Sequence, residues 1–418
     1  MNKEGADNEL KTLIISSGYY GLDEYMKEEN NLYALLVCSE KMLPLEFSFK
    51  ERIYFSFDSS PEGIVETIRK IDTSFDYLMC IDDKFMNSVN YIKSELNIKS
   101  FLLDGAISRD KYILKQLMDE VGINYPKTLK VSDWAELLEK ESAILYPVVV
   151  KPSNSYGSNS VYLVESKTAL LKYAKNIFNR NRFQTKFYGD ANNLLLVEEY
   201  INGKEFAVDI IWNNGLPKNK MISSRLHAKN TIMFPDYVYY YDCKLDAQKQ
   251  NAIYDLAESV GRMIGIKNGA THTEIREKEG KLYVLENAVR PGGGGCMYEL
   301  HRYHTNQNYF KNYCNVMKNE TIEFENNSIE DGRYYFFMTY ANENSGIVKD
   351  VFFDNSKLDK NIEVFKVEYL VKKGDRILPV DSTMRYTIFV FGAISADSEE
   401  RFKIEIEKVN DACRLDIE

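Results

Sequence analysis

Residues 269–295 read GATHTEIREKEGKLYVLENAVRPGGGG, and this stretch guides the interpretation of the whole chain. Alternating side chains on either side of Glu279-Gly280 predict two short β-strands joined by a turn. Side chains on a strand repeat every two residues, so Glu274 and Glu286 can lie side by side on one hairpin face. Two opposed carboxylates repel each other unless a cation lies between them, and a hard divalent cation carrying phosphate oxygens meets that need. A surface hairpin with two solvated acids is the alternative.

The residues after the second predicted strand favour an anion site. Arg290 supplies a guanidinium, and the glycine run that ends at Gly295 supplies backbone without side chains. Both features can hold an anion closely. We therefore expect Arg290, Gly293 and Gly294 to contact an anionic substrate group.

The composition limits the classes of partner. A chain of 418 residues can bury a large core and is expected to divide into two or three domains. The net charge of -10 argues against a nucleic-acid or anionic-membrane partner, because phosphates would not be neutralised over a wide surface. We expect no signal peptide, and no apolar run approaches the roughly 20 residues that span a bilayer. Six scattered cysteines without a CxxC pair are typical of reduced thiols, which predicts a cytoplasmic protein.

The N-terminal region alternates strands and helices. The apolar runs 10–16, 33–38 and 75–81 predict buried strands, with a helix over 64–71. Such strands indicate a parallel sheet covered on both faces, although SSGYYG after the first strand is not a G-x-G-x-x-G fingerprint. We expect a doubly wound domain over residues 1–105.

Lys111 lies in the first turn of a predicted helix over 108–122, whose apolar stripe is Tyr112, Ile113, Leu117 and Val121. The helix start and Lys111 together could meet a phosphate. A solvated lysine is the alternative.

Lys151 ends a predicted strand over 147–151 whose hairpin partner is 161–164. The loop 152–160 between them is rich in Ser, Asn and Gly, and includes Ser155 and Ser158. Such a loop presents backbone amides and hydroxyls and could fold over a triphosphate. An ordinary polar hairpin loop is the alternative.

Two further strands are predicted over 194–198 and 205–212, after a helix over 168–178 and a polar loop over 184–193. Glu198 and Glu199 precede a strand break, where free backbone groups could pair with the edge of a heterocycle. Glu205 could accept hydrogen bonds from vicinal hydroxyls. Each acid, taken alone, could equally be a solvated residue at a strand end.

Taken in this order, these pieces resemble the ATP-grasp superfamily over residues 10–295. The resemblance is carried by Lys111 in SRDK, Lys151 in YPVVVKPSNSYGS, EEYINGKE at 198–205, and Glu274 with Glu286 through RPGGGG. It implies an α/β domain followed by two α+β lobes that clasp ATP. The expected divisions are 1–105, a small lobe with the phosphate loop over 106–200, a large lobe with the metal site over 201–330, and a C-terminal α+β lobe over 331–418.

The resemblance also implies a set of ligands and roles. The residues expected to bind ATP are Lys111, Lys151, Ser155, Ser158, Glu198, Glu199, Tyr200, Ile201 and Glu205. Glu274 and Glu286 would hold Mg²⁺, for which Mn²⁺ can substitute, and the expected catalytic residues are Lys151, Glu286 and Arg290. The reaction of the family activates a carboxylate as an acyl phosphate, which a nucleophile, usually an amine, then captures.

One departure from the family pattern narrows the expectation. The usual E-x-N is here Glu286-Asn287-Ala288, so Ala288 takes a ligand position and Asn287 should point to the opposite face. The dipeptide-forming L-amino-acid ligases are similar in having E-x-A-x-R and an HTE-like strand, here at residues 272–274. We therefore expect an ADP-forming ligase that joins two amino acids, with small-molecule partners only and a homodimer as one option. A ligase of another small carboxylate, purine-pathway-like or carboxylase-like, and a nucleotide-binding regulatory protein without turnover are the alternatives.

Further residues are candidates for substrate contact. Arg225, His227 and Lys229 alternate along one predicted strand and could form a wall for a substrate carboxylate, as could His272. His301 and His304 share a predicted helix near Cys296, for which zinc is a minor alternative. From residue 333 the chain is strand-rich with a closing helix over 398–413, and Arg385 is a further candidate contact there.

Overall fold

The structure is a computed structural model of the 418-residue chain. It describes residues 11–16, 32–37, 51–55, 60–70, 74–81, 85–103, 107, 109–155, 157–158, 160–188, 194–228, 231–292, 296–320, 322, 329–340, 342–379 and 386–418. Among the described helices, none combines the length and the apolar character needed to cross a membrane.

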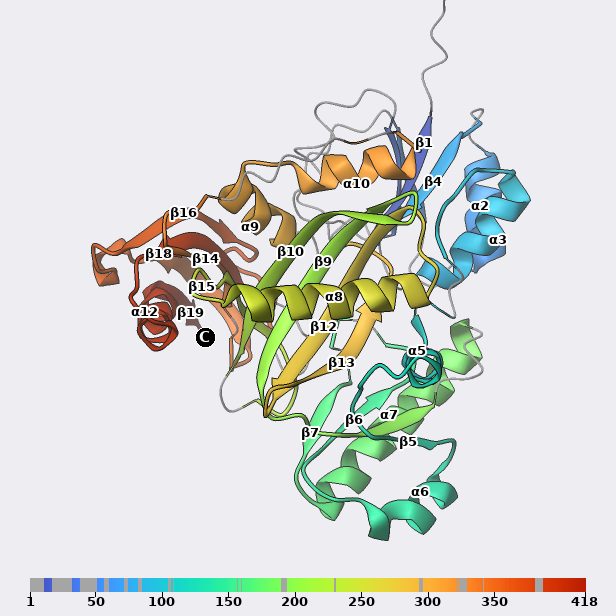
Figure 1. The fold of residues 1–418 in the computed structure, drawn as a ribbon, viewed down its shortest axis with the longest axis horizontal. Helices are drawn as coiled ribbons and strands as arrows, with labels where there is room; N and C mark the ends of the chain where they lie inside the picture. The colour runs from blue at the N-terminus through green and yellow to red at the C-terminus, as the bar shows by residue number, and fades with distance from the viewer. Residues whose placement is uncertain are drawn as a thin grey trace, which may run out of the picture.

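The N-terminal region forms a four-stranded parallel sheet, as the apolar runs predict, in the order β3-β2-β1-β4 (Figure 1). Its elements are β1 (Thr12–Ser16), β2 (Leu32–Val37), β3 (Glu51–Phe55), α2 (Pro61–Arg69), β4 (Tyr77–Cys80) and α3 (Met86–Leu96). Strand β3 was not predicted, because its sequence ERIYF begins with two charged residues that interrupt the apolar run.

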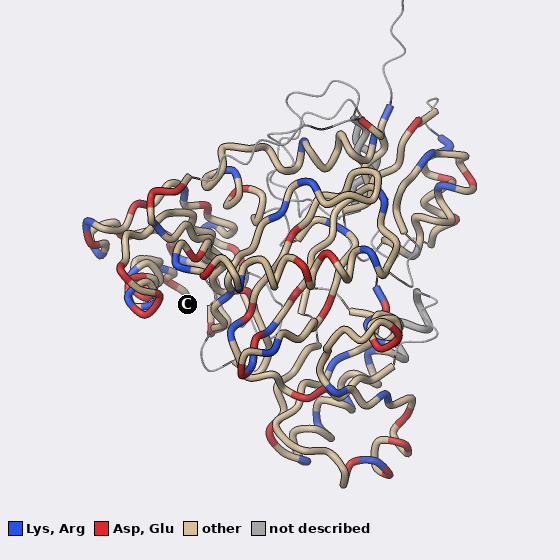
Figure 2. The backbone as a smooth tube through the Cα atoms, viewed as in Figure 1, with Lys and Arg blue, Asp and Glu red and all other residues tan. Residues whose placement is uncertain are grey.

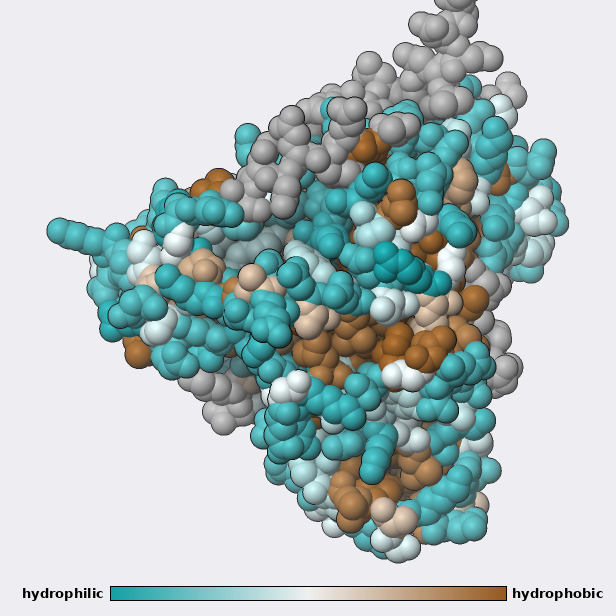
Figure 3. All heavy atoms as spheres, in the orientation of Figure 1, coloured by the Kyte–Doolittle hydropathy of each residue, from teal (hydrophilic) through white to brown (hydrophobic). Residues whose placement is uncertain are grey.

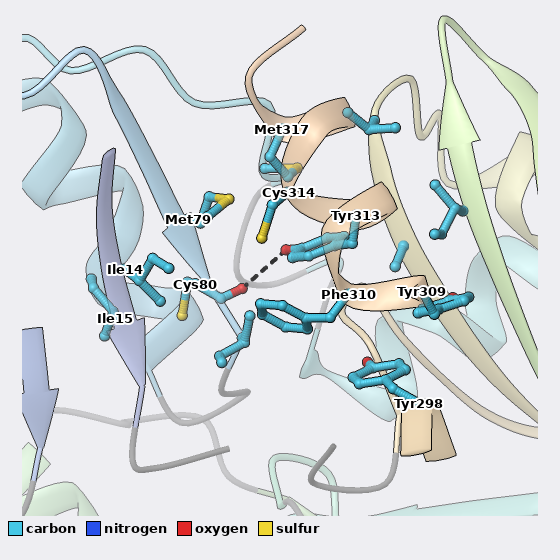
Figure 4. Close-up of a cluster of buried hydrophobic side chains, with 14 of the residues drawn as sticks. Ile14, Ile15, Met79, Cys80, Tyr298, Tyr309, Phe310, Tyr313, Cys314 and Met317 are labelled. Atoms are coloured by element: carbon cyan, nitrogen blue, oxygen red, sulfur yellow. Dashed lines mark hydrogen bonds between the residues drawn. The ribbon is translucent and has the colours of Figure 1, made fainter. Parts of the chain in front are cut away.

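The helix α10 (Tyr309–Met317) joins this sheet to the rest of the molecule (Figure 4). Cys314 and Met317 on α10 face Met79 on β4, and the Tyr313 hydroxyl donates to the Cys80 carbonyl over 3.4 Å. The N-terminal sheet and the central part of the chain therefore share one hydrophobic cluster.

The next region is a four-stranded antiparallel sheet in the order β5-β8-β6-β7. Its elements are α5 (Lys111–Glu120), β5 (Thr128–Val131), α6 (Trp134–Lys140), the 3₁₀ turn η2 (Glu141–Ala143), β6 (Val148–Pro152), β7 (Tyr162–Val164), α7 (Lys167–Tyr188) and β8 (Leu195–Glu199). The predicted hairpin is confirmed, since β6 and β7 pair from Val148↔Val164 to Val150↔Tyr162. The loop predicted to begin at residue 184 is wrong as far as Tyr188, because α7 continues through polar residues that extend an established helix readily.

The orientation predicted for α5 is also wrong. Its buried residues are Lys111, Leu114, Lys115 and Met118, whereas the expected stripe of Tyr112, Ile113 and Leu117 is only half-buried and Val121 is exposed. Asp110 caps the helix by accepting hydrogen bonds from the amides of residues 112 and 113.

An eight-stranded sheet in the order β13-β12-β9-β10-β11-β14-β18-β16 forms the centre of the molecule. Its strands are β9 (Lys204–Asn213), β10 (Leu216–His227), β11 (Asp236–Tyr241), β12 (Gly269–Lys278), β13 (Lys281–Ala288), β14 (Tyr334–Tyr340), β16 (Ile362–Tyr369) and β18 (Ile388–Ile394). Figure 1 shows α8 (Ala247–Met263) lying across one face, where Phe206 and Ile210 of β9 join its hydrophobic cluster. Ala207 and Ile211 instead join the cluster that contains α9 (Cys296–Thr305) and α10, so these helices serve the other face.

The C-terminal region is strand-rich, as predicted, and adds a smaller sheet in the order β17-β15-β19. Its elements are β15 (Gly346–Phe353), the 3₁₀ turn η4 (Asn355–Lys357), β17 (Arg376–Ile377), α12 (Glu399–Ala412) and β19 (Cys413–Ile417). The closing helix is confirmed, and β14 pairs with β11 across the boundary expected at residue 330. The four expected divisions stay predictions.

The face shown in Figure 3 is mainly hydrophilic, with hydrophobic groups gathered in two places. One lies between α8 and the sheet β5-β8-β6-β7, and the other lies on the lobe that carries α6. The exposed hydrophobic residues of that lobe include Trp134, Leu138 and Leu145.

Candidate active site

The two acids of the opening hairpin are direct neighbours. Glu274 of β12 and Glu286 of β13 are paired in the antiparallel register, and their side chains are 26% and 29% exposed. A β-bulge makes this possible, because Ile275 pairs with Val284 while Glu274 pairs with Glu286, leaving Leu285 as the extra residue. In a regular strand Glu286 would share the face of Val284, which is buried in the cluster beneath α8.

The side chain of Asn287 points to the face of the hairpin that the sequence predicts. Its side-chain amide donates to Thr273 Oγ1 over 2.7 Å, on the side of the hairpin away from Glu274 and Glu286. Ala288 lies opposite His272 in the register, so this position offers no oxygen ligand.

Lys111 approaches the acidic pair from α5. Its ammonium lies 3.1 Å from Glu286 Oε1 and donates to the Ser155 carbonyl over 2.8 Å, with only 4% of the side chain exposed. The alternative of a solvated lysine is therefore excluded. Ser158 is half-buried and has φ of 53°, in the left-handed region that residues other than glycine adopt uncommonly.

Lys151 is buried beside the predicted adenine-binding segment. Its Nζ lies 2.9 Å from Glu198 Oε2, and Lys115 Nζ lies 3.2 Å from Glu198 Oε1. Burial lowers the pKa of Lys151, but Glu198 and Glu286 outweigh burial and raise the pKa above its ordinary value. Lys151 therefore supplies positive charge to the interior of the site.

The other residues of this segment have separate partners. The Ile201 carbonyl accepts from Arg276 Nη1 over 3.1 Å, and the Tyr200 ring lies 5.2 Å from the Arg276 guanidinium. Glu199 is half-buried, and Lys278 Nζ donates to its carboxylate over 3.5 Å. Neither Glu199 nor Glu198 is a freely solvated acid.

Glu205 forms the centre of an ion network. Its Oε1 accepts from Arg225 Nη1 over 2.8 Å, its Oε2 accepts from Arg276 Nε over 2.6 Å, and His227 Nε2 lies 3.0 Å from the same Oε2. Burial raises the pKa of Glu205, but the neighbouring cations hold it well below the ordinary range. Ribose binding by Glu205 stays a prediction, and a sugar hydroxyl would have to share a carboxylate that is already occupied.

Arg225 links this network to the acidic pair. Its Nη1 lies 3.8 Å from Glu274 Oε1, and its Nη2 donates to Asp236 Oδ1 over 2.8 Å. Figure 2 shows acidic and basic positions interspersed along these central strands. Of the predicted substrate wall, Arg225 and His227 lie on this face, whereas Lys229 falls outside the described residues.

Asp209 joins His272 to the start of the glycine loop. His272 Nδ1 lies 3.1 Å from Asp209 Oδ2, and the Gly292 amide donates to Asp209 Oδ1 over 3.0 Å. His272 Nε2 lies 3.9 Å from Glu274 Oε1. Burial lowers the pKa of His272, but Asp209 and Glu274 raise it to about 10, so this histidine is an imidazolium at neutral pH.

The close packing at Gly292 gives a stability prediction. A Cβ atom there would lie 2.1 Å from His272 Nδ1, so Gly292→Ala must displace the imidazole from Asp209. We expect the free energy of unfolding to fall by about 1–3 kcal/mol, measured by urea denaturation. The matched control is Gly63→Ala, where the nearest atom to the new Cβ is Ser60 Oγ at 3.7 Å. Equal stability of the two variants would contradict the packing described here.

The anion loop is only partly described. The Arg290 Nη1 group donates to the Pro291 carbonyl over 2.7 Å, and Gly293, Gly294 and Gly295 lie outside the described residues. Arg385 also lies outside them. The proposed anion contacts of Arg290, Gly293 and Gly294 stay predictions.

The residues present fit a magnesium–nucleotide complex. Within the described ranges no group of three or more His, Cys, Asp and Glu side chains is placed to hold a metal by itself. Mg²⁺ needs no such cage, because it usually binds one or two carboxylates together with substrate phosphates and water. Glu274 and Glu286 supply the carboxylates, and Lys111 and Lys151 can balance the phosphate charge.

The two histidines of α9 do not belong to such a site. His301 is buried between neutral groups, with its Nδ1 3.0 Å from the Tyr241 hydroxyl and its Nε2 3.5 Å from Asn219 Nδ2. Burial lowers the pKa of His301 to about 3 and that of His304 to about 4. Both therefore remain neutral packing residues down to moderately acidic pH.

This burial predicts acid sensitivity. Between about pH 6.5 and pH 3, an unfolded chain binds a proton at residue 301 that the folded chain does not, so stability falls as the pH falls. The contribution approaches about 1.4 kcal/mol per pH unit. Urea denaturation of His301→Gln, which cannot titrate, should show a shallower loss from pH 6 to pH 4 than the parent protein. Parallel pH profiles would contradict this assignment.

Three residues of the site were missed by the sequence analysis: Lys115, Asp209 and Arg276. Lys115 follows Lys111 by four residues, a spacing that places both on one helix face, and this signal was available. Asp209 and Arg276 lie within strands next to hydrophobic residues, and only the strand register places them beside His272 and Glu205.

Comparison with known proteins gives consistent matches. Residues 144–299 match the family model of the ATP-grasp domain. Among solved structures, the L-amino acid ligase from Bacillus licheniformis superposes with a TM-score of 0.83 at 20% identity, covering 98% of this chain and 99% of that chain. Phosphoribosylglycinamide synthetase from Anaerococcus prevotii superposes with a TM-score of 0.66 at 16% identity, covering 98% and 100%.

The relatives found by sequence match over smaller parts of the chains. The carbamoyl phosphate synthase large chain of Clostridium beijerinckii is 25% identical over 67% of this chain, which spans only 26% of that protein. The D-alanine–D-alanine ligase of Pelagibacter ubique is 28% identical over 50% of this chain and 67% of its own length. Together with the strand order described above, these matches show that the chain has the ATP-grasp fold, with residues 144–299 matching the model of the ATP-grasp domain.

Proposed function

We propose that this protein is an ATP-dependent, ADP-forming ligase that activates a carboxylate as an acyl phosphate and joins it to an amine. The observation that carries the proposal is the acidic pair Glu274 and Glu286, with cations converging on it from separate elements. Lys111 comes from α5, Arg225 from β10 and His272 from β12. Such a ring of fixed charges suits the transfer of a phosphoryl group, whose charge must be stabilised as it moves.

Each residue has a defined task in this proposal. Lys111 and Lys151 bind phosphate oxygens, and the loop 152–160 covers them to exclude water. Glu274 and Glu286 would hold Mg²⁺, which would neutralise phosphate charge and orient the transferred group. Arg290 and the glycine loop hold the acyl phosphate until the amine attacks, and water exclusion protects that intermediate from hydrolysis.

Lysine–acid pairs prepare the site for this task. In the structure Lys111 is paired with Glu286 and Lys151 with Glu198. With the nucleotide bound, Lys111 would contact phosphate in place of Glu286, and Glu286 would be available to hold the metal. These ion pairs hold the charges close to one another within the site.

Amino acids are the proposed substrates. The full-length superposition on the L-amino acid ligase extends through the C-terminal region, and the HTE strand and E-x-A-x-R pattern support the same class. Arg225 and His272 offer positive charge to a carboxylate. Asp236, whose side chain is 36% exposed, offers negative charge to an ammonium group.

A phosphate-release screen tests the proposal. The protein is incubated with MgATP and amino acids singly and in pairs, with the Glu286→Gln variant as the control for contaminating phosphatases. Release that depends on pairs, with a dipeptide of matching mass, supports dipeptide ligation. Release with one carboxylate and a non-amino-acid nucleophile favours a ligase of another small carboxylate, and silence with bound ATP favours a regulatory protein.

A further inference from the structure

Lys115 is a buried cation to which the proposed reaction gives no task. It lies one turn after Lys111 on α5, and its side chain is 3% exposed. Its Nζ is 3.2 Å from Glu198 Oε1, while Lys151 Nζ is 2.9 Å from Glu198 Oε2. One buried carboxylate is thus paired with two buried ammonium groups, although a single lysine would neutralise its charge.

The contact between Lys115 and Glu198 is a close, buried ion pair. Although the two charges are close, neither Lys115 Nζ nor Glu198 Oε1 has a hydrogen-bond partner among the residues that the structure describes. A buried acceptor without a donor is unfavourable, because the hydrogen bond it made to water is not replaced. Glu198 Oε1 therefore depends on the ammonium of Lys115 for compensation of its charge.

Both groups are charged at neutral pH. Burial lowers the pKa of Lys115 to about 8, against the opposing effect of Glu198. Burial raises the pKa of Glu198, but Lys115 and Lys151 outweigh burial and bring that pKa below its ordinary value. The carboxylate is therefore an acceptor only.

Under the proposed function, nucleotide binding would change this balance. When Lys151 turns toward phosphate oxygens, Glu198 loses one of its two cations while it remains buried. A buried carboxylate left without a cation tends to take up a proton, since burial disfavours the charged form. Lys115 contacts the other oxygen and lies 5.3 Å from the Tyr125 ring centroid, so it can stay with Glu198.

We propose that Lys115 is a positioning residue that keeps Glu198 ionised and oriented toward the exocyclic amine of adenine, and thereby sets a preference for adenine over guanine nucleotides. This inference rests on the proposed function, because it assumes that Glu198 meets the base. The 6-amino group of adenine donates to a carboxylate, whereas the 6-oxo group of guanine accepts and is repelled. A protonated Glu198 could donate to the 6-oxo group, and the discrimination would weaken.

Calorimetric titration with three magnesium nucleotides tests the proposal: ATP, GTP and purine riboside triphosphate, which lacks the 6-amino group. In Lys115→Met, we expect the ratio of ATP to GTP affinity to fall by about tenfold or more, as loss of one charge-assisted hydrogen bond implies. The advantage of ATP over purine riboside triphosphate should shrink in parallel. Lys115→Arg should retain most of the discrimination, and Lys127→Met, the same change at an exposed residue of this lobe, should retain all of it.

The outcomes separate a positioning role from a structural one. Equal loss of affinity for all three nucleotides in Lys115→Met, or unchanged ratios, would overturn the proposal. If Lys115→Met does not fold, the same titrations are made with Lys115→Gln. In the parent protein, equal affinity for ATP and for purine riboside triphosphate would also overturn the proposal. A parent protein that binds none of the nucleotides overturns the proposed function and this inference with it. A parent that turns over ATP, with discrimination unchanged in Lys115→Met, overturns this inference alone.

Discussion

Replacing Glu286 with glutamine is expected to reduce ATP turnover by about 100-fold or more, because the amide cannot supply the negative charge that holds Mg²⁺ beside the phosphates. Glu286 also neutralises Lys111 at 3.1 Å, so the variant leaves that buried ammonium without its carboxylate. The measurement is the initial rate of phosphate release across a range of Mg²⁺ concentrations. Partial recovery at high Mg²⁺ would agree with a weakened metal site.

The matched control is Glu277→Gln on the neighbouring strand. Glu277 follows Glu274 by three residues on β12, which places it on the opposite face, where it contacts Lys249 of α8 at 2.9 Å. This variant should keep the activity of the parent protein. If Glu286→Gln also retains substantial turnover, the metal assignment is wrong.

Replacing Lys151 with methionine is expected to raise the KM for ATP by about 10- to 100-fold, as removal of a charge-assisted phosphate contact implies. The change also removes the ion pair between Lys151 and Glu198, so that Glu198 keeps only its ion pair with Lys115 of the two described above. Steady-state kinetics with ATP as the varied substrate measures the effect, and circular dichroism establishes that the variant is folded.

Lys130→Met is the corresponding control for charge and side-chain volume. Lys130 lies on β5 of the same sheet, with its ammonium 4.9 Å from the Tyr112 ring centroid and without a role in the proposed site. Its KM should equal that of the parent protein. An unchanged KM in Lys151→Met would mean that this lysine serves the folded structure and not the nucleotide.

Much of the architecture could be predicted from local patterns. Apolar runs indicated the parallel strands β1, β2 and β4, and Asn214-Gly215 and Glu279-Gly280, with positive φ values, form the two hairpin turns that their sequences suggest. Strand β19 was not predicted, because the five residues 413–417 follow a helix directly and have no partner near them in the sequence.

The residue types of the candidate site were also visible in the sequence. Alternation in the hairpin favoured Glu274 and Glu286 as neighbours, and the register confirms that they are paired. The reason is different from simple alternation, however, because a bulge at Leu285 turns Glu286 onto the face of Glu274. A pattern with a period of two contains no information about where such an extra residue is inserted.

The sequence alone was sufficient for the parallel strands β1, β2 and β4, the acidic hairpin and the two lysines that precede it. It was not sufficient for the partners of those charges. The face that α5 buries, the two lysines on Glu198 and the ring of cations around Glu205 depend on segments far apart in the chain. Ion pairing requires separations of a few ångströms, and those are set by strand register and by packing between elements, whereas periodicity within one element constrains only which side chains share a face.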